Sequence, residues 1–335
     1  MIRGARAHGT TSSAAAAAQA ALDAGGTAVD AVVAGYFVVA GESPVGLLAP
    51  AALLVAGPAA GARLFDGRAA QPGRGGSRPR GVGPDDAAPI AASAAAPRAP
   101  AMIALAHAQR GKLGLRELSR AGVEAARAAG AAARGALLSR FGQAGVTALA
   151  ADAVLEALLD AAGTAAGGAL TRDDVTEATP EDTSAIEVTL DGGRAVVLPA
   201  AFERGAAADP PRLIAIVAVD GKGVAAALAL DVAPGVLAPS LEVSLPARAV
   251  IARRGVPRLA PGTPLAMHAP LAIVVGRAIT IALALPGAST LGDAGLGVLL
   301  SGQTAEDALA DVVRRSGAAR SLGVARVGSD ARVLT

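Results

Sequence analysis

The near absence of aromatic side chains sets the tightest limit on what this chain can fold into. Among its 335 residues there are four Phe, one Tyr and no Trp. Hydrophobic residues still make up 53% of the chain, so its core has to be built from Ala, Val and Leu. Protein interiors are close-packed, and small side chains fill little volume, so helices and strands must approach one another closely. We therefore expect a globular chain with tightly spaced elements, and not a disordered one.

Several classes of site are excluded by composition. The chain contains no Cys, which removes disulfides, thiolate catalysis and Cys-ligated zinc or iron–sulfur centres. Its three histidines, His8, His107 and His268, lie far apart in sequence and lack the spacing of metal ligands. We therefore predict no metal site and no cofactor. The net charge is only +2, so we expect no nucleic-acid partner.

No segment predicts entry into a membrane. The most apolar early run, residues 28–40, contains Asp30 and reaches only about two thirds of the roughly 20 residues that a spanning helix needs. The first 13 residues lack the apolar stretch of a secretory signal. We expect no membrane partner and a cytoplasmic location.

The hydrophobic pattern changes from helical to alternating along the chain. Helices are predicted at residues 14–24, 27–40, 99–110, 115–129, 134–144, 149–161, 290–300 and 304–313. Strands are predicted at residues 51–56, 62–65, 186–190, 194–198, 213–219, 224–230, 245–252, 271–275 and 278–285. Turn sequences predict hairpins around Asp191-Gly192-Gly193 and Asp220-Gly221-Lys222-Gly223. Helices, then strands, then helices predict an α+β protein whose sheets lie between helical layers.

A series of short motifs resembles the γ-glutamyltranspeptidase (γ-glutamyltransferase) family. The sequence LDAGGTAVDA at residues 22–31 is similar to the family's GGNAVDA signature. Further similar blocks follow in the family's order at residues 64–72, 111–113, 167–174, 219–224, 260–270, 285–287 and 304–308. The ordered set extends over residues 4–313, and the chain is shorter than a full family member.

This resemblance implies an N-terminal-nucleophile (Ntn) hydrolase fold, which is a four-layer αββα sandwich. Residues 1–335 would then form a single domain, with residues 1–205 corresponding to the family's large subunit and residues 206–335 to its small subunit. Residues 69–100, which are rich in Gly, Pro and Ala, are expected to form a flexible loop.

The resemblance also locates the position of the family nucleophile, and that position carries no hydroxyl. Family members cleave themselves before a Thr, whose hydroxyl attacks the γ-glutamyl amide while its own amine acts as base. Counting back from Asp220-Gly221 places Pro211 there, and its neighbours Asp209, Pro210 and Leu213 offer no substitute. The nearest upstream hydroxyls belong to Thr183, Ser184 and Thr189. We therefore predict no catalytic residue and an uncleaved chain.

The substrate-binding groups of the family are only partly retained. The family's Ser pair aligns with Ala266-Met267, and its oxyanion-hole Gly pair aligns with Gly287 and Ala288. Arg68 matches the Arg that binds the substrate carboxylate, a role that suits a planar two-point donor, but Asp66 could hold it instead. His268 could act as a base, although a lone His is usually structural.

These substitutions favour an inactive scaffold that acts as a binding or assembly subunit. We expect a homo-oligomer or a hetero-oligomer, with an active family member as one candidate partner. The alternative is an altered amidohydrolase or acyltransferase, which would use Thr183 or Ser184 as nucleophile or share its site with a partner chain.

Overall fold

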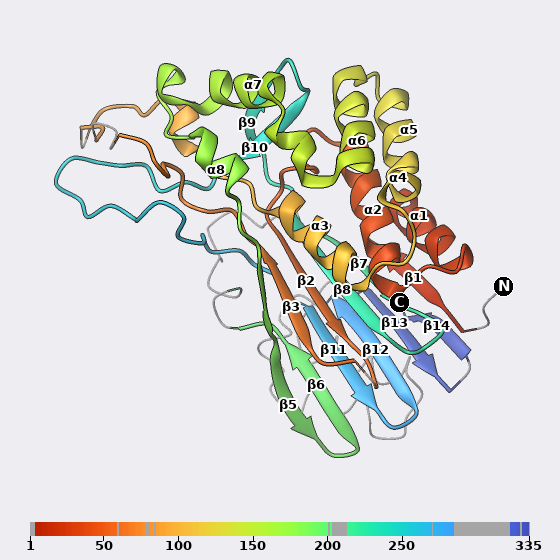
Figure 1. Cartoon of the computed structure of the whole chain (residues 1–335). Helices are drawn as coiled ribbons and strands as arrows, with labels where there is room; N and C mark the ends of the chain where they lie inside the picture. Colours follow the sequence, from red (N-terminus) through yellow and green to blue (C-terminus); the bar gives the residue numbers. More distant parts are fainter. Residues whose placement is uncertain are drawn as a thin grey trace.

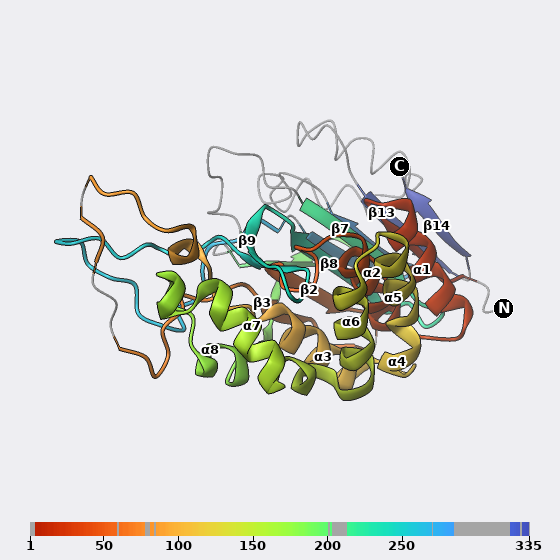
Figure 2. The same cartoon turned by 90° about the horizontal axis from the view of Figure 1, so that it is seen from above.

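The computed structural model of the chain describes residues 4–58, 60–77, 81–83, 85–199, 202, 213–269, 271–284, 322–328 and 330–334. Within these ranges, two six-stranded sheets pack on each other, and helices cover the outer face of the first sheet (Figures 1 and 2). Three of the four expected layers are therefore present. The predicted helices at residues 290–300 and 304–313 lie outside the described residues.

The first sheet is antiparallel and has the order β1-β7-β8-β2-β3-β4. Its strands are β1 (Arg6–Gly9), β7 (Leu213–Val219), β8 (Ala225–Asp231), β2 (Ala51–Ala56), β3 (Arg63–Gly67) and β4 (Glu181–Ser184). Every residue of β2 and β8 is buried. This follows from their position, because helices cover one face of these strands and the second sheet covers the other.

The second sheet has the order β14-β13-β12-β11-β6-β5 and is also antiparallel. Its strands are β14 (Asp330–Leu334), β13 (Leu322–Val327), β12 (Ile279–Ala284), β11 (Leu271–Gly276), β6 (Gly193–Val197) and β5 (Ile186–Leu190). Both predicted hairpins, β5–β6 and β7–β8, are confirmed. Each sheet combines strands from residues 1–205 with strands from residues 206–335.

The helical layer is built around one helix that is almost completely buried. The helices are α1 (Ser12–Asp23), α2 (Ala28–Glu42), α3 (Ala99–Arg110), α4 (Leu115–Leu118), α5 (Arg120–Ala128), α6 (Ala132–Ala144), α7 (Asp152–Ala162) and α8 (Arg172–Thr176). Residues 28–41 of α2 are all buried, as its largely apolar sequence predicts. Among the described helices, none has the length and apolar character needed to cross a bilayer.

Helices α2 and α5 approach more closely than side chains would allow. A Cβ atom on Gly41 would lie 2.0 Å from the carbonyl oxygen of Gly122, and one on Gly122 would lie 2.2 Å from that of Phe37. The five aromatic side chains are all buried, and Phe37 packs edge-on against Tyr36 and Phe141 with ring centroids 5.5 and 5.6 Å apart. The close spacing expected from the small-residue composition is thus found at this helix pair.

One predicted strand is wrong. Residues 245–252 do not form a strand, because β10 (Val243–Pro246) ends at Pro246 and residues 248–252 have no regular structure. Proline has no amide hydrogen to donate to a ladder, so strand pairing stops there. Among the described strands, β10 pairs with β9 (Gly235–Ala238) alone, outside both large sheets.

Residues 69–100 are connected to the rest of the chain by several hydrogen bonds. Ala70 forms an antiparallel bridge with Pro264, and the amides of Gly73 and Arg74 donate to Asp174 at 2.7 and 3.1 Å. Asp174 also caps the start of α8 together with Thr171, as expected for a carboxylate at a helix start. The flexibility of this loop stays a prediction.

Candidate functional site

The start of β7 and Arg68 lie at the same end of the strands of the first sheet. Residue Leu213 pairs with Asp231, Leu230 pairs with Ala51, and Ala51 pairs with Gly67. Arg68 follows Gly67, three strands from β7, which corresponds to about 14 Å at the usual strand spacing. Pro211, at the aligned nucleophile position, lies outside the described residues, as do Gly287 and Ala288.

The guanidinium of Arg68 is bound to a buried carboxylate. Its Nη2 donates to Asp66 Oδ2 at 2.7 Å, and its Nε lies 3.1 and 3.0 Å from Oδ1 and Oδ2. The backbone amide of Arg68 also donates to Asp66 Oδ1 at 2.9 Å. Of the two alternatives that the sequence leaves open for Arg68, the structure contains the ion pair with Asp66. A second carboxylate would have to compete with it for the guanidinium.

Phe202 covers the same guanidinium from another side. The Cζ atom of Arg68 lies 4.3 Å from the centroid of the Phe202 ring, and the ring is buried. This cation–π contact fixes the plane of the guanidinium in addition to the ion pair. Sequence analysis missed Phe202, although its rarity as one of five aromatic residues was an available signal.

The segment of His268 reaches this site through Phe202. The amide of Ala269 donates to the carbonyl oxygen of Phe202 at 3.2 Å, so residues 268 and 269 lie beside Phe202 and hence near Arg68. His268 is half-buried, and no hydrogen bond joins its imidazole to another described residue. The structure therefore brings the segments of two candidate residues together, but among the described residues none orients His268.

A second arginine lies close to this site. The bridge between Ala70 and Ala96 places Arg98 on the segment adjacent to Arg68. Arg98 is buried, donates from Nε and Nη2 to the carbonyl oxygen of Thr179, and lies 3.5 Å from Glu181 Oε1. Its Nη1 is buried without a hydrogen-bond partner. The site thus holds two guanidinium groups and two carboxylates, so its formal charge is balanced.

The hydroxyls considered as alternative nucleophiles lie elsewhere. Thr183 and Ser184 are exposed on β4 and pair with Leu64 and Arg63 of β3. Strand β4 is four strands from β7, or about 19 Å, and Ser184 lies at the opposite end of β3 from Gly67. Thr189 is on β5 of the other sheet. A hydroxyl needs a base within hydrogen-bond reach, and no described hydrogen bond provides one for these three.

One hydroxyl does contact β7, and its hydrogen bonds are structural. Thr10 Oγ1 accepts from the amide of Ala215 at 2.9 Å and donates to its carbonyl oxygen at 3.3 Å.

His8, two residues earlier on β1, has a pKa lowered by burial, so it is uncharged at neutral pH. Among the described residues, no group of three or more His, Asp or Glu side chains could hold a metal ion.

Comparison with known proteins identifies the fold. No protein-family profile matches the chain, and no curated protein matches it. The structure of cephalosporin acylase from Bacillus halodurans is similar, with a TM-score of 0.72, 12% identity, and coverage of 99% of this chain and 96% of that chain. The structure of LmbA2991HD is similar with a TM-score of 0.69, 15% identity and the same coverage.

The similarity to a γ-glutamyltranspeptidase is more local. The enzyme from Pseudomonas nitroreducens, solved in complex with L-DON, matches with a TM-score of 0.50 and 18% identity over 59% of this chain and 72% of that chain. Identities this low show the fold alone. The chain therefore has the Ntn-hydrolase fold that cephalosporin acylase and γ-glutamyltranspeptidase share.

Proposed function

We propose that this chain is a non-catalytic protein of the Ntn-hydrolase fold, which stays uncleaved and acts in the cytoplasm as a binding or assembly subunit. The observation that carries this proposal is Pro211 at the position aligned with the family nucleophile. Proline has no hydroxyl, and strand β7 begins two residues later, at Leu213, as the alignment expects.

The state of Arg68 supports the same proposal. A carboxylate clamp has to leave its guanidinium available to substrate, but Arg68 is engaged by Asp66 and Phe202. Breaking a partly buried ion pair of this kind is unfavourable, because Asp66 would be left buried without its counter-charge. Binding of a γ-glutamyl carboxylate at Arg68 is therefore disfavoured.

Processing and turnover test the proposal directly. Intact-mass measurement and a denaturing gel of the purified chain should show one species of 32.3 kDa. Incubation with γ-glutamyl-p-nitroanilide should release no chromophore above the rate without protein. Two fragments that divide the chain near residue 183 or 210 would contradict the proposal, and so would turnover.

The same assay decides the alternative enzyme hypothesis. The variants Ser184→Ala and Thr183→Val should give the same background rate as the parent, because neither hydroxyl lies near the start of β7. If the parent turned over an anilide and either variant abolished that rate, the chain would be an amidohydrolase with a relocated nucleophile.

We also propose that the chain works as an assembly, either with its own copies or with an active homologue. Large apolar side chains that reach solvent support this. Four that are exposed among the described residues are Ile90, Ile186, Leu237 and Val333.

Size-exclusion chromatography with light scattering tests the assembly. We expect the purified chain at micromolar concentration, alone or mixed with a catalytically active homologue, to elute with a mass of at least twice 32.3 kDa. A monomer that also fails to join the homologue would rule the assembly out. That result would leave the prediction of no turnover unaffected.

A further inference from the structure

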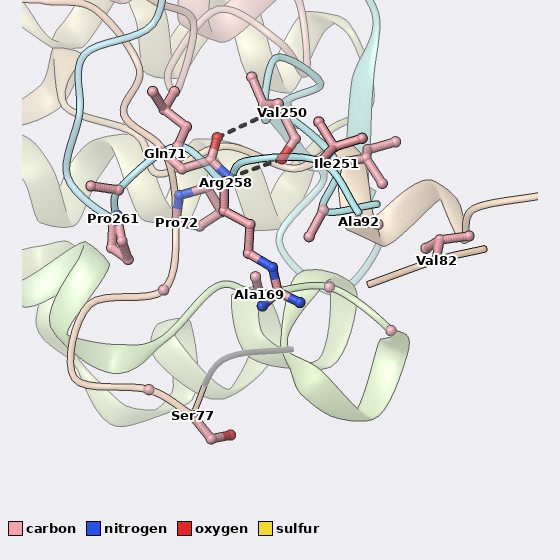
Figure 3. Close-up of a pocket in the computed structure, with 18 of the residues that line it drawn as sticks. Gln71, Pro72, Ser77, Val82, Ala92, Ala169, Val250, Ile251, Arg258 and Pro261 are labelled. Carbon is pink, nitrogen blue, oxygen red and sulfur yellow. Dashed lines mark hydrogen bonds between the residues drawn. The ribbon is translucent and has the colours of Figure 1, made fainter. Parts of the chain in front are cut away.

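A cavity of about 570 Å³ lies in the loops at the end of the molecule away from α1 (Figure 2), and Figure 3 shows it in close-up. Residues 71–77, 167–169 and 250–261 supply most of its lining. Its volume falls within the range of about 300–1,000 Å³ that is usual for small-molecule sites. None of the side chains of the Arg68 site lines it.

The frame of the cavity is fixed by hydrogen bonds. The side chain of Gln71 accepts from the amide of Val250 at 2.9 Å and donates to its carbonyl oxygen at 3.0 Å, as Figure 3 shows. The backbone of Gln71 bonds to Gly262 and Thr263 at 2.7 and 2.9 Å. On another wall, Gly73 donates to Asp174 at 2.7 Å. Because hydrogen bonds already hold the walls in place, the protein loses little conformational entropy when a ligand binds.

The lining side chains are mostly apolar, and several of them are exposed to solvent. Val250, Val256 and Leu259 are 51, 57 and 36% exposed, and all three line the cavity. Exposed apolar groups of this size are unfavourable in water and would be covered by the apolar body of a ligand. The walls therefore favour a ligand with a hydrocarbon portion.

Arg258 is the one charged residue of the described lining, and it is exposed, with no partner among the described residues. The side chain of Arg258 extends from its loop into the cavity toward Ala169 (Figure 3). No hydrogen bond or ion pair joins it to another described residue. By contrast, Arg254 on the same loop donates to the carbonyl oxygen of Gly81 at 3.2 Å. A free guanidinium beside an apolar wall suits a carboxylate, which can accept two hydrogen bonds from it.

We propose that this cavity binds a small monoanionic ligand with an apolar body, of the class of aliphatic carboxylates. The carboxylate pairs with Arg258, and the hydrocarbon chain lies against Val250, Val256 and Leu259. This inference specifies what the proposed binding subunit binds and rests on that proposed function. Its test is independent of processing and turnover, so one proposal can fail while the other stands.

Calorimetric titration of the intact chain with octanoate tests the site. We expect saturable binding of one octanoate, which Arg258→Met weakens at least tenfold because the guanidinium charge and its donors are lost while an unbranched side chain is kept. Octanamide, which has the same chain without the charge, should bind the parent at least tenfold more weakly. Arg277→Met is the matched control, since Arg277 is exposed in the turn between β11 and β12 and does not line the cavity.

A second variant tests the cavity itself while the charge is retained. Ala169→Phe places a ring in the space that Arg258 points toward, so octanoate binding should be lost. Circular dichroism melting of each variant checks that it folds. The proposal is overturned if the parent shows no saturable binding, or if both Arg258→Met and Ala169→Phe bind octanoate as tightly as the parent.

Discussion

Substituting Ala for Gly122 lowers the free energy of unfolding by about 2–3 kcal/mol, because the added methyl group overpacks a closed helix interface. The new Cβ would lie 2.2 Å from the carbonyl oxygen and 3.0 Å from the Cβ of Phe37. Neither of these atoms is the end of a flexible side chain, so helices α2 and α5 have to separate. Their separation would also loosen the buried aromatic cluster of Phe37 and Phe141.

Gly135→Ala is the matched control and should change stability in the opposite direction. Gly135 lies inside helix α6, and its new Cβ would meet Ala126 Cβ at 3.5 Å, an ordinary van der Waals distance. Helix propensity favours Ala over Gly by about 1 kcal/mol at both sites. We therefore expect Gly135→Ala to raise the midpoint of urea unfolding and Gly122→Ala to lower it. Shifts of the same sign would contradict the described packing of α2 against α5.

Removal of the Asp30 carboxylate is expected to destabilise the chain by about 3 kcal/mol, because buried donors would lose their acceptor. Asp30 is fully buried at the start of α2. Its Oδ2 accepts from the amides of Thr27 and Lys112 at 2.8 and 2.9 Å, and from the Thr27 hydroxyl at 3.1 Å. One carboxylate thus caps α2 and holds the loop that follows α3.

A graded series measures this contribution. Urea unfolding of Asp30→Ala should show the full loss, whereas Asp30→Asn keeps one acceptor oxygen and should lose about half as much. Asp160→Ala is the control, since Asp160 is exposed on α7 and should change stability by less than about 0.5 kcal/mol. If Asp30→Ala unfolded at the same urea concentration as Asp160→Ala, the carboxylate would not hold these segments together.

Local signals in the sequence were sufficient for most elements. The apolar runs of β2, β7 and β8 and the turn sequences between strands predicted their positions, because burial on both faces needs an uninterrupted apolar run. Strand β4, with the sequence EDTS, was not predicted, since it has no apolar alternation and lies at a sheet edge. Its pairing depends on β3, more than 110 residues earlier.

The candidate site was predictable only in part. The motif alignment identified Arg68 and offered Asp66 as its partner, because the two residues are close neighbours in sequence. The rarity of aromatic residues could have singled out Phe202, but its contact with Arg68 could not be inferred, because the two residues are 134 positions apart in sequence. The cavity at Arg258 has the same origin, because its walls come from three separate parts of the chain.

By itself, the sequence determined most of the helices, the strands with long apolar runs, the small-residue core and the absence of a hydroxyl at Pro211, because each depends on residue type and short-range spacing. Only the tertiary structure decided which glycines are required. Gly122 and Gly135 are both glycines inside helices. The backbone of Phe37 lies against Gly122, whereas the nearest atoms to Gly135 are at ordinary van der Waals distance. The same holds for Arg68, whose engagement by Phe202 is set by atoms distant in sequence, which no local pattern encodes.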